Sequence, residues 1–89
     1  MSTSEESLLT FPCDFPLKIM GRRDEQFAQS IADLLRELAP GFEPATMDMR
    51  PSRNGTYLSL TCVVHVTSRE QLDGIYRALT AHPLVKFAL

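Results

Sequence analysis

The chain has 89 residues, of which 44% are hydrophobic and 22% are charged, and its formal net charge at pH 7 is -2. This length allows one domain and excludes large multidomain enzymes and solenoid repeats. The apolar fraction is too high for a disordered chain. The slightly acidic balance argues against general nucleic-acid binding, which normally requires a basic surface.

Residues 1–10 are polar and include Glu5 and Glu6, so we interpret them as a flexible tail before a single domain at residues 11–89. A secretory signal would need a basic start followed by an apolar run. No stretch of the sequence approaches the ~20 apolar residues that cross a bilayer. We therefore expect a cytoplasmic protein that does not contact a membrane.

The first predicted elements are a strand and a helix. Residues 15–20 alternate in polarity, which predicts a half-buried strand that ends at Gly21. Asp24 is suited to cap the following helix through its side-chain oxygen. Pro40 and Gly41 end that helix. Its apolar stripe has the spacing of one helical face and consists of Phe27, Ile31, Leu34, Leu35 and Leu38.

Two further strands are predicted on either side of a tight turn. Residues 45–52 form the first, with Met47 and Met49 facing the core, and Pro51 places this strand at a sheet edge because proline has no N–H to donate. The pair Asn54–Gly55 favours a hairpin turn. Residues 57–66 then predict a long central strand, whose apolar face consists of Leu58, Leu60, Cys62, Val64 and Val66.

The last predicted elements are a second helix and a short strand. Ser68 and Gln71 fit a capping box at the start of the helix. His82 and Pro83 end it, and residues 85–89 alternate as a strand. The inner face of the helix consists of Leu72, Ile75, Tyr76 and Leu79.

This element order is βαββαβ, which predicts an α+β fold: a ferredoxin-like two-layer sandwich with an antiparallel sheet in the order 4-1-3-2. The order places the strand with Pro51 at an edge and the long strand of residues 57–66 inside the sheet. It also makes the strands joined by the Asn54–Gly55 turn neighbours.

Several short motifs carry a family resemblance that extends from Phe11 to Leu89. The chain resembles the YbeD family of small bacterial proteins, and this resemblance implies an ACT-domain-like variant of the ferredoxin-like fold. ACT-like domains are regulatory, bind small metabolites such as amino acids, and commonly associate side by side. The resemblance implies no particular activity. Its motifs are Phe11-Pro12, Lys18-Ile19-Met20-Gly21, Pro51-Ser52 and Gly55-Thr56-Tyr57-Leu58-Ser59.

The sequence predicts neither a metal site nor a catalytic site. Cys62 and His65 are an odd number of residues apart on one strand, so they should point to opposite faces of the sheet. No Cys-x-x-Cys pair is present. Cys62 should lie in the core as an inert thiol, and no neighbour in the sequence activates Cys13. We therefore expect a non-enzymatic protein without a cofactor.

Comparison with two groups of ferredoxin-like proteins leads to the same expectation. The loop at residues 20–24 lacks the glycine pattern with which acylphosphatases bind phosphate. RNA-binding domains of this topology stack bases on aromatic residues of the central strands, and only Tyr57 offers such a ring. We therefore expect no nucleic-acid partner.

The topology does gather cations at one end of the sheet. The first two strands are parallel, so both end there, the first helix begins there and the second ends there. Gly21, without a Cβ, should let a ligand approach the backbone. The predicted ligand-binding residues, suited to a carboxylate or phosphate, are Gly21, Arg22, Arg23, Arg50, Arg53 and His82. The alternative is that these arginines are merely solvated, because Asp24 and Glu25 lower the local potential.

These observations favour a small regulatory or sensor domain that binds a small anionic metabolite. The alternative is a protein–protein interaction module that acts through the open sheet face or an edge strand and binds no small ligand. Pairing of the free edge of the last strand would also allow a homodimer.

Overall fold

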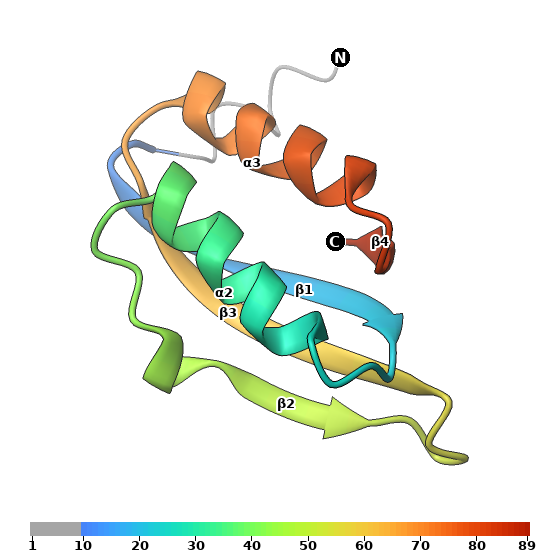
Figure 1. Cartoon of the computed structure of the whole chain (residues 1–89). Helices are drawn as coiled ribbons and strands as arrows, with labels where there is room; N and C mark the ends of the chain where they lie inside the picture. Colours follow the sequence, from blue (N-terminus) through green and yellow to red (C-terminus); the bar gives the residue numbers. More distant parts are fainter. Residues whose placement is uncertain (1–9) are drawn as a thin grey trace.

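Two helices pack on one face of a four-stranded antiparallel sheet (Figure 1). The computed structural model describes residues 10–89, so the interpretation of residues 1–9 as part of a tail lies outside the described residues. The elements in chain order are β1 (Cys13–Arg22), α2 (Phe27–Leu38), the 3-10 turn η1 (Pro44–Thr46), β2 (Asp48–Pro51), β3 (Tyr57–Val66), α3 (Arg69–Ala81) and β4 (Val85–Ala88).

The sheet order is β2-β3-β1-β4, which confirms the predicted order 4-1-3-2 read from the other edge. β1 pairs with β3 along its whole length, from Cys13 opposite Val66 to Arg22 opposite Tyr57. The short strands β2 and β4 form the two edges, and the proline in β2 predicted the edge position of that strand. This architecture is the ferredoxin-like βαββαβ sandwich.

The core lies between the sheet and the helices, and its pattern follows the predicted stripes. On β1, Leu17 and Ile19 are fully buried, while Lys18 between them lies on the uncovered face. Leu34 and Leu38 of the α2 stripe are half-buried. The fully buried side chains also include Phe27, Ile31, Leu35, Leu60, Cys62, Val64, Val66, Ile75 and Leu79.

The prediction that Gly21 ends the first strand is wrong, because β1 continues through it to Arg22. Gly21 is buried and lies against the helix layer. A Cβ built on it would lie 2.3 Å from the carbonyl oxygen of Leu84 and 2.5 Å from the ring of Phe27. The missing side chain therefore serves close packing between β1, α2 and the residue before β4.

The second strand is shorter than predicted. Residues 44–46 form the η1 turn, and all four residues of β2 are exposed. Met47 packs against the core, as predicted. Met49 is opposite the buried Leu60 and so lies on the core side of the sheet, but it remains 54% exposed. The prediction that Met49 belongs to the core is therefore wrong, because the side chain is not buried.

Both helix starts use the predicted residues in a slightly different way. Asp24 accepts a hydrogen bond from the N–H of Gln26 at 2.8 Å, in the turn before α2 begins. At α3, the Ser68 hydroxyl oxygen accepts from the N–H of Gln71 at 3.1 Å, as a capping box requires. The side chain of Gln71, however, accepts from the N–H of Thr67 at 2.8 Å instead of from Ser68.

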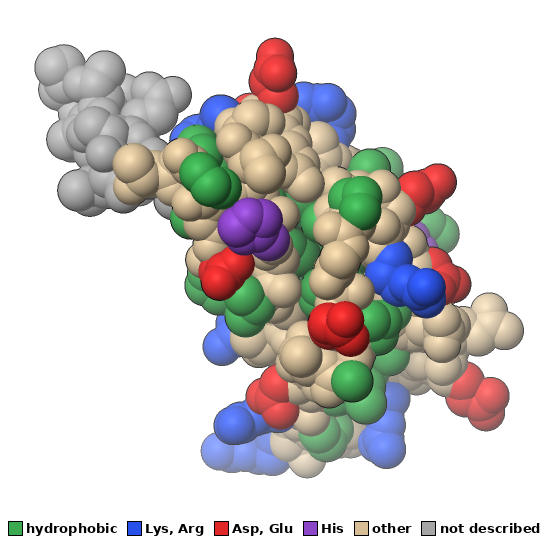
Figure 2. Space-filling view, turned by 90° about the vertical axis from the view of Figure 1, so that its left-hand side faces the viewer, with side chains coloured by type: hydrophobic (Ala, Val, Ile, Leu, Met, Phe, Trp, Pro, Cys, Tyr) green, Lys and Arg blue, Asp and Glu red, His purple; other side chains and the backbone are tan. Residues whose placement is uncertain are grey.

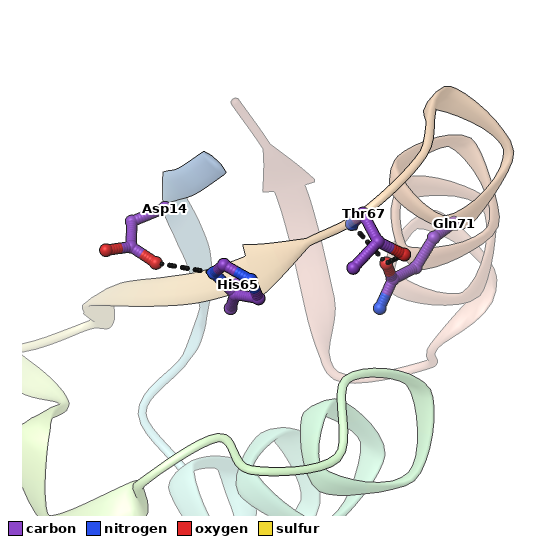
Figure 3. Close-up of polar contacts among 4 residues, drawn as sticks. All are labelled: Asp14, His65, Thr67 and Gln71. Carbon is purple, nitrogen blue, oxygen red and sulfur yellow. Dashed lines mark hydrogen bonds and ion pairs between the residues drawn. The ribbon is translucent and has the colours of Figure 1, made fainter. Parts of the chain in front are cut away.

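Gln71 also joins the two helices. Its Oε1 accepts from the Thr67 hydroxyl at 3.1 Å (Figure 3), and its Nε2 donates to the carbonyl oxygen of Leu38 at 3.0 Å. Leu38 is the last residue of α2, whose final carbonyls have no partner within the helix. The Gln71 side chain thus gives a terminal carbonyl of α2 a hydrogen-bond donor and holds Thr67 in place just before α3.

Candidate functional site

The end of the sheet where β1 and β2 finish carries the predicted cationic cluster, which we call the arginine end: Arg22, Arg23 and Arg53. It lies at the right-hand side of Figure 1. Arg22 is opposite Tyr57, and the N–H of Arg23 donates to the carbonyl oxygen of Thr56 at 3.1 Å. The end of β1 is therefore fixed to the β2–β3 turn, which carries Arg53.

Arg23 lies across this turn. One terminal nitrogen of its guanidinium is 3.1 Å from the place where a Cβ on Gly55 would stand. Gly55 has a φ of +78°, which the Asn54–Gly55 turn signal predicted. The glycine therefore supplies both the turn geometry and the space for the arginine.

Arg50 was predicted to join this cluster, but it lies outside the arginine end. It lies on the uncovered face of β2, opposite Ser59. Its Nε is 3.1 Å from a carboxylate oxygen of Asp48, and both side chains are well exposed. An exposed pair of this kind contributes about 0–1 kcal/mol to stability, and it engages one of the five N–H donors of the guanidinium.

His82 ends α3 at the same end of the sheet, in the helix layer. Its Nδ1 accepts a hydrogen bond from the N–H of Leu84 at 3.1 Å. Nδ1 is therefore unprotonated in this arrangement, and Nε2 is the nitrogen left for another partner. Within residues 10–89, the ring forms no hydrogen bond or ion pair with the arginines.

The expectation that Gly21 opens the backbone to a ligand is wrong. The carbonyl oxygen of Leu84 and the ring of Phe27 already occupy the space beside its Cα. Gly21 contributes to the arginine end only by letting β1 pack closely enough to place Arg22.

From the sequence, Lys86 is interpreted as an ordinary polar residue of the exposed sheet face, but the structure places it beside Tyr57 in this region. The pairing of β1 with β4 shifts between Met20 and Gly21. Lys86 lies over the Tyr57 ring, with its Nζ 5.9 Å from the ring centroid, a distance at which a cation is attracted to the aromatic face. A shift in strand pairing leaves no local sequence signal, so this contact could not be predicted.

Charge at the arginine end is only partly balanced. Asp24 and Glu25 follow Arg23 in the chain. In the part of the chain that the structure describes, the ion pairs within 4 Å are Arg50–Asp48, His65–Asp14 and Arg69–Asp73. None of these pairs includes Arg22, Arg23 or Arg53.

The opposite end of the sheet carries the His65–Asp14 pair (Figure 3). Figure 2 views the molecule from this side and shows a histidine next to an acidic side chain on the surface. The two residues are direct partners across β1 and β3, and Nδ1 lies 3.0 Å from the carboxylate oxygen. Cys62, three residues before His65, is in the core, so the predicted separation of these two side chains is confirmed. No group of three potential metal ligands is found among residues 10–89.

The two thiols differ in environment. Burial raises the pKa of the Cys62 thiol to about 11, because the thiolate would lose its hydration. Cys13 is half-buried. Since the unfolded chain loses the Cys62 proton first as the pH rises, the free energy of unfolding falls above the ordinary thiol range.

Ellman's reagent in mildly alkaline buffer is expected to label Cys13 quickly and Cys62 only as fast as the protein unfolds, because the reagent reacts with exposed thiolates. Mass spectrometry of the labelled protein identifies the site. Cys13→Ser should remove the fast phase, and concentrated guanidinium should make both thiols reactive. Rapid labelling of Cys62 in the native protein would contradict its burial.

Neither α2 nor α3, within residues 10–89, has both the length and the apolarity needed to cross a bilayer.

Solved structures of similar shape share little sequence with this chain. The solution structure of protein HP0495 from H. pylori superposes with a TM-score of 0.78 at 16% identity, covering 100% of this chain and 93% of that chain. The crystal structure of the ACT domain of GTP pyrophosphokinase from Chlorobium tepidum has a TM-score of 0.67 at 13% identity, covering 86% of this chain and 97% of that domain. The second likeness shows that the fold is ACT-domain-like.

Relatives by sequence are much closer. A UPF0250 protein of Bordetella pertussis is 52% identical over 85 residues, which are 96% of this chain and 93% of the relative. One from Nitrosomonas europaea is 51% identical over 86 residues, covering 97% of this chain and 99% of the relative. A family model described as "Protein of unknown function (DUF493)" matches residues 6–89. The chain therefore belongs to the DUF493 family, the family of small bacterial YbeD proteins that its motifs resemble.

Proposed function

We propose that this protein is a small, non-catalytic regulatory or sensor domain that binds an anionic metabolite at the arginine end. The observation that carries the proposal is the position of Arg22, Arg23 and Arg53. They lie at the end of β1, just after it and in the β2–β3 turn, and none of them has a carboxylate partner within 4 Å among residues 10–89. Arg50 and Arg69, by contrast, are each paired with an aspartate.

The chemistry of this cluster suits a carboxylate or phosphate. A guanidinium presents a planar fork of N–H donors that binds either group through two hydrogen bonds. Arg23 and Arg53 belong to the turn side of the cluster, while Arg22 and Lys86 lie beside Tyr57 on the uncovered face. A ligand at this end would thus meet positive charge from two sides.

Two further observations support regulation over catalysis. One protein of similar fold is the ACT domain of GTP pyrophosphokinase, and ACT-like domains are regulatory modules that bind small metabolites. In addition, the thiol of Cys62 is buried, and the rings of His65 and His82 bond to Asp14 and to a backbone N–H. A nucleophile needs a base within hydrogen-bond reach.

Thermal shift with amino acids, dicarboxylates, citrate, inorganic phosphate and phosphorylated sugars tests the proposal. Binding to the folded state raises the melting temperature by mass action, so at least one compound should do so. Arg22→Ala combined with Arg23→Ala should raise its Kd about tenfold or more, corresponding to about 1.4 kcal/mol. Isothermal titration calorimetry measures the Kd.

Arg69→Ala is the matched control, because it removes an arginine from the first turn of α3, where Arg69 is paired with Asp73. Its Kd should equal that of the unmodified protein. If no compound shifts the melting temperature, or if the double variant binds as tightly as Arg69→Ala, the arginine end is not an anion site.

A further inference from the structure

A hollow of about 300 Å³ lies between α2 and the edge strand β2. We call it the α2–β2 groove. Gln29 lies at its side, and its remaining wall is apolar: Ala28, Ala32, Pro44, Ala45, Met47 and Met49. The groove is on the helix side of the sheet, away from the uncovered face that carries Arg22 and Lys86.

Small residues on α2 create the groove. Ala28 and Ala32 are one helical turn apart on the side of α2 that faces β2. They are too short to cover Met49, which is 54% exposed although its partner on β3, Leu60, is fully buried. The structure of residues 10–89 thus leaves an apolar surface open where the core would otherwise continue.

The wall formed by β2 is a sheet edge. Among residues 10–89, β2 pairs only with β3, and all four residues of β2 are exposed. Within this described part of the chain, no other strand lies beyond β2 in Figure 1. Every second residue of an edge strand directs its N–H and C=O outward, so an extended segment could hydrogen-bond to β2 and place alternate side chains over the groove. Pro51 has no N–H and limits such pairing to the residues before it.

Charge around the groove is mainly acidic. Gln29 donates to a carboxylate oxygen of Asp33 at 2.9 Å, and Glu43 directly precedes Pro44; both acids are exposed. The nearby cations are Arg36, one turn beyond Ala32, and Arg50, whose guanidinium is engaged by Asp48. The rim therefore favours a positively charged occupant. It disfavours residues 1–9 of this chain, whose only charged side chains are acidic.

We propose that the α2–β2 groove binds an extended segment of a partner protein in which apolar side chains stand next to Lys or Arg. The backbone of the segment pairs with β2, its apolar side chains contact the alanines and methionines, and its basic side chains face Asp33 and Glu43. Methionine side chains are flexible and polarizable, and so they adapt to different apolar groups. This site is independent of the arginine end.

Selection of random phage-displayed peptides on the full chain tests the proposal. Enriched peptides are expected to combine Leu, Ile, Val, Phe or Met with Lys or Arg. A fluorescein-labelled synthetic copy of the most enriched peptide gives the Kd by anisotropy. Replacing its Lys and Arg by Glu should raise the Kd about tenfold or more, and added salt should weaken binding of the original peptide, because exposed charges are screened.

Two variants of the protein locate the binding. Ala45→Trp fills the groove from an exposed position and should raise the Kd about tenfold or more. Ala81→Trp, at an exposed alanine where α3 ends, should leave it unchanged. The combination of Arg22→Ala and Arg23→Ala should also leave it unchanged, which separates this site from the proposed anion site. Melting temperatures verify that all variants fold.

Backbone amide shifts of the labelled protein provide the second readout. Addition of the selected peptide should move the amides of Gln29, Met47 and Met49. The proposal is overturned if no peptide is enriched, if enriched peptides lack basic residues, or if Ala45→Trp binds as tightly as Ala81→Trp. Shifts of the same amides that depend on protein concentration without peptide would assign the groove to a second copy of this chain and would also overturn it.

Discussion

Gly21→Ala is expected to lower the free energy of unfolding by about 3 kcal/mol, because overpacking of a tight site typically costs this much or slightly less. The added Cβ would stand 2.3 Å from the carbonyl oxygen of Leu84, which is backbone and cannot rotate away. It would also meet the Phe27 ring at 2.5 Å. For a domain of this size, the loss corresponds to a fall in melting temperature of more than about 10 °C.

Gly74→Ala is the matched control. Gly74 lies inside α3, and a Cβ there would meet nothing within 4 Å. Alanine is favoured over glycine inside a helix by about 0.5–1 kcal/mol, so this variant should melt at a higher temperature than the unmodified protein. If both variants changed stability alike, the close approach of β1, α2 and Leu84 would be wrong.

Leu60→Ala is expected to lower the free energy of unfolding by about 2–5 kcal/mol, the range for a large buried aliphatic side chain. Met49, its direct partner on β2, provides the comparison. Met49→Ala should cost less than about 1 kcal/mol, because an exposed side chain loses little packing. Urea unfolding followed by circular dichroism measures both values.

The difference between these two partners shows where the core stops. Both side chains point to the helix layer, yet Leu60 is fully buried and Met49 is not. A loss at Met49 as large as that at Leu60 would mean that the α2–β2 groove is closed in solution.

Much of the fold could be predicted because hydrophobic periodicity is local. The alternation on β3 and the stripes on α2 and α3 predicted that strand and the two helices, and Asn54–Gly55 with Pro51 predicted the hairpin and the edge. The role of Gly21 could not be predicted in the same way. Its neighbours are the Phe27 ring and Leu84, and Leu84 is distant in sequence, so only the assembled fold distinguishes a packing glycine from a strand end.

The topology determines which residues lie at the candidate site, and this part of the site could be predicted from the sequence. The positions of Arg22, Arg23 and Arg53 follow from where β1 ends and where the hairpin turns. The pairing of Arg50 with Asp48 and of the His82 ring with the Leu84 N–H depends on side-chain rotamers. The place of Lys86 over Tyr57 depends on a shift in strand register. None of these features has a local pattern in the sequence.

The place of β1 in the sheet has a consequence during synthesis on the ribosome. β1 lies between β3 and β4, so the first strand to be made receives its second neighbour only when the last strand has emerged. Until then, the edge of β1 that later binds residues 85–89 is unprotected in the nascent chain. Late pairing between distant segments slows folding and exposes strand edges to aggregation. Completion of the sheet therefore waits for the contact between β1 and β4, its two strands that are most distant in sequence.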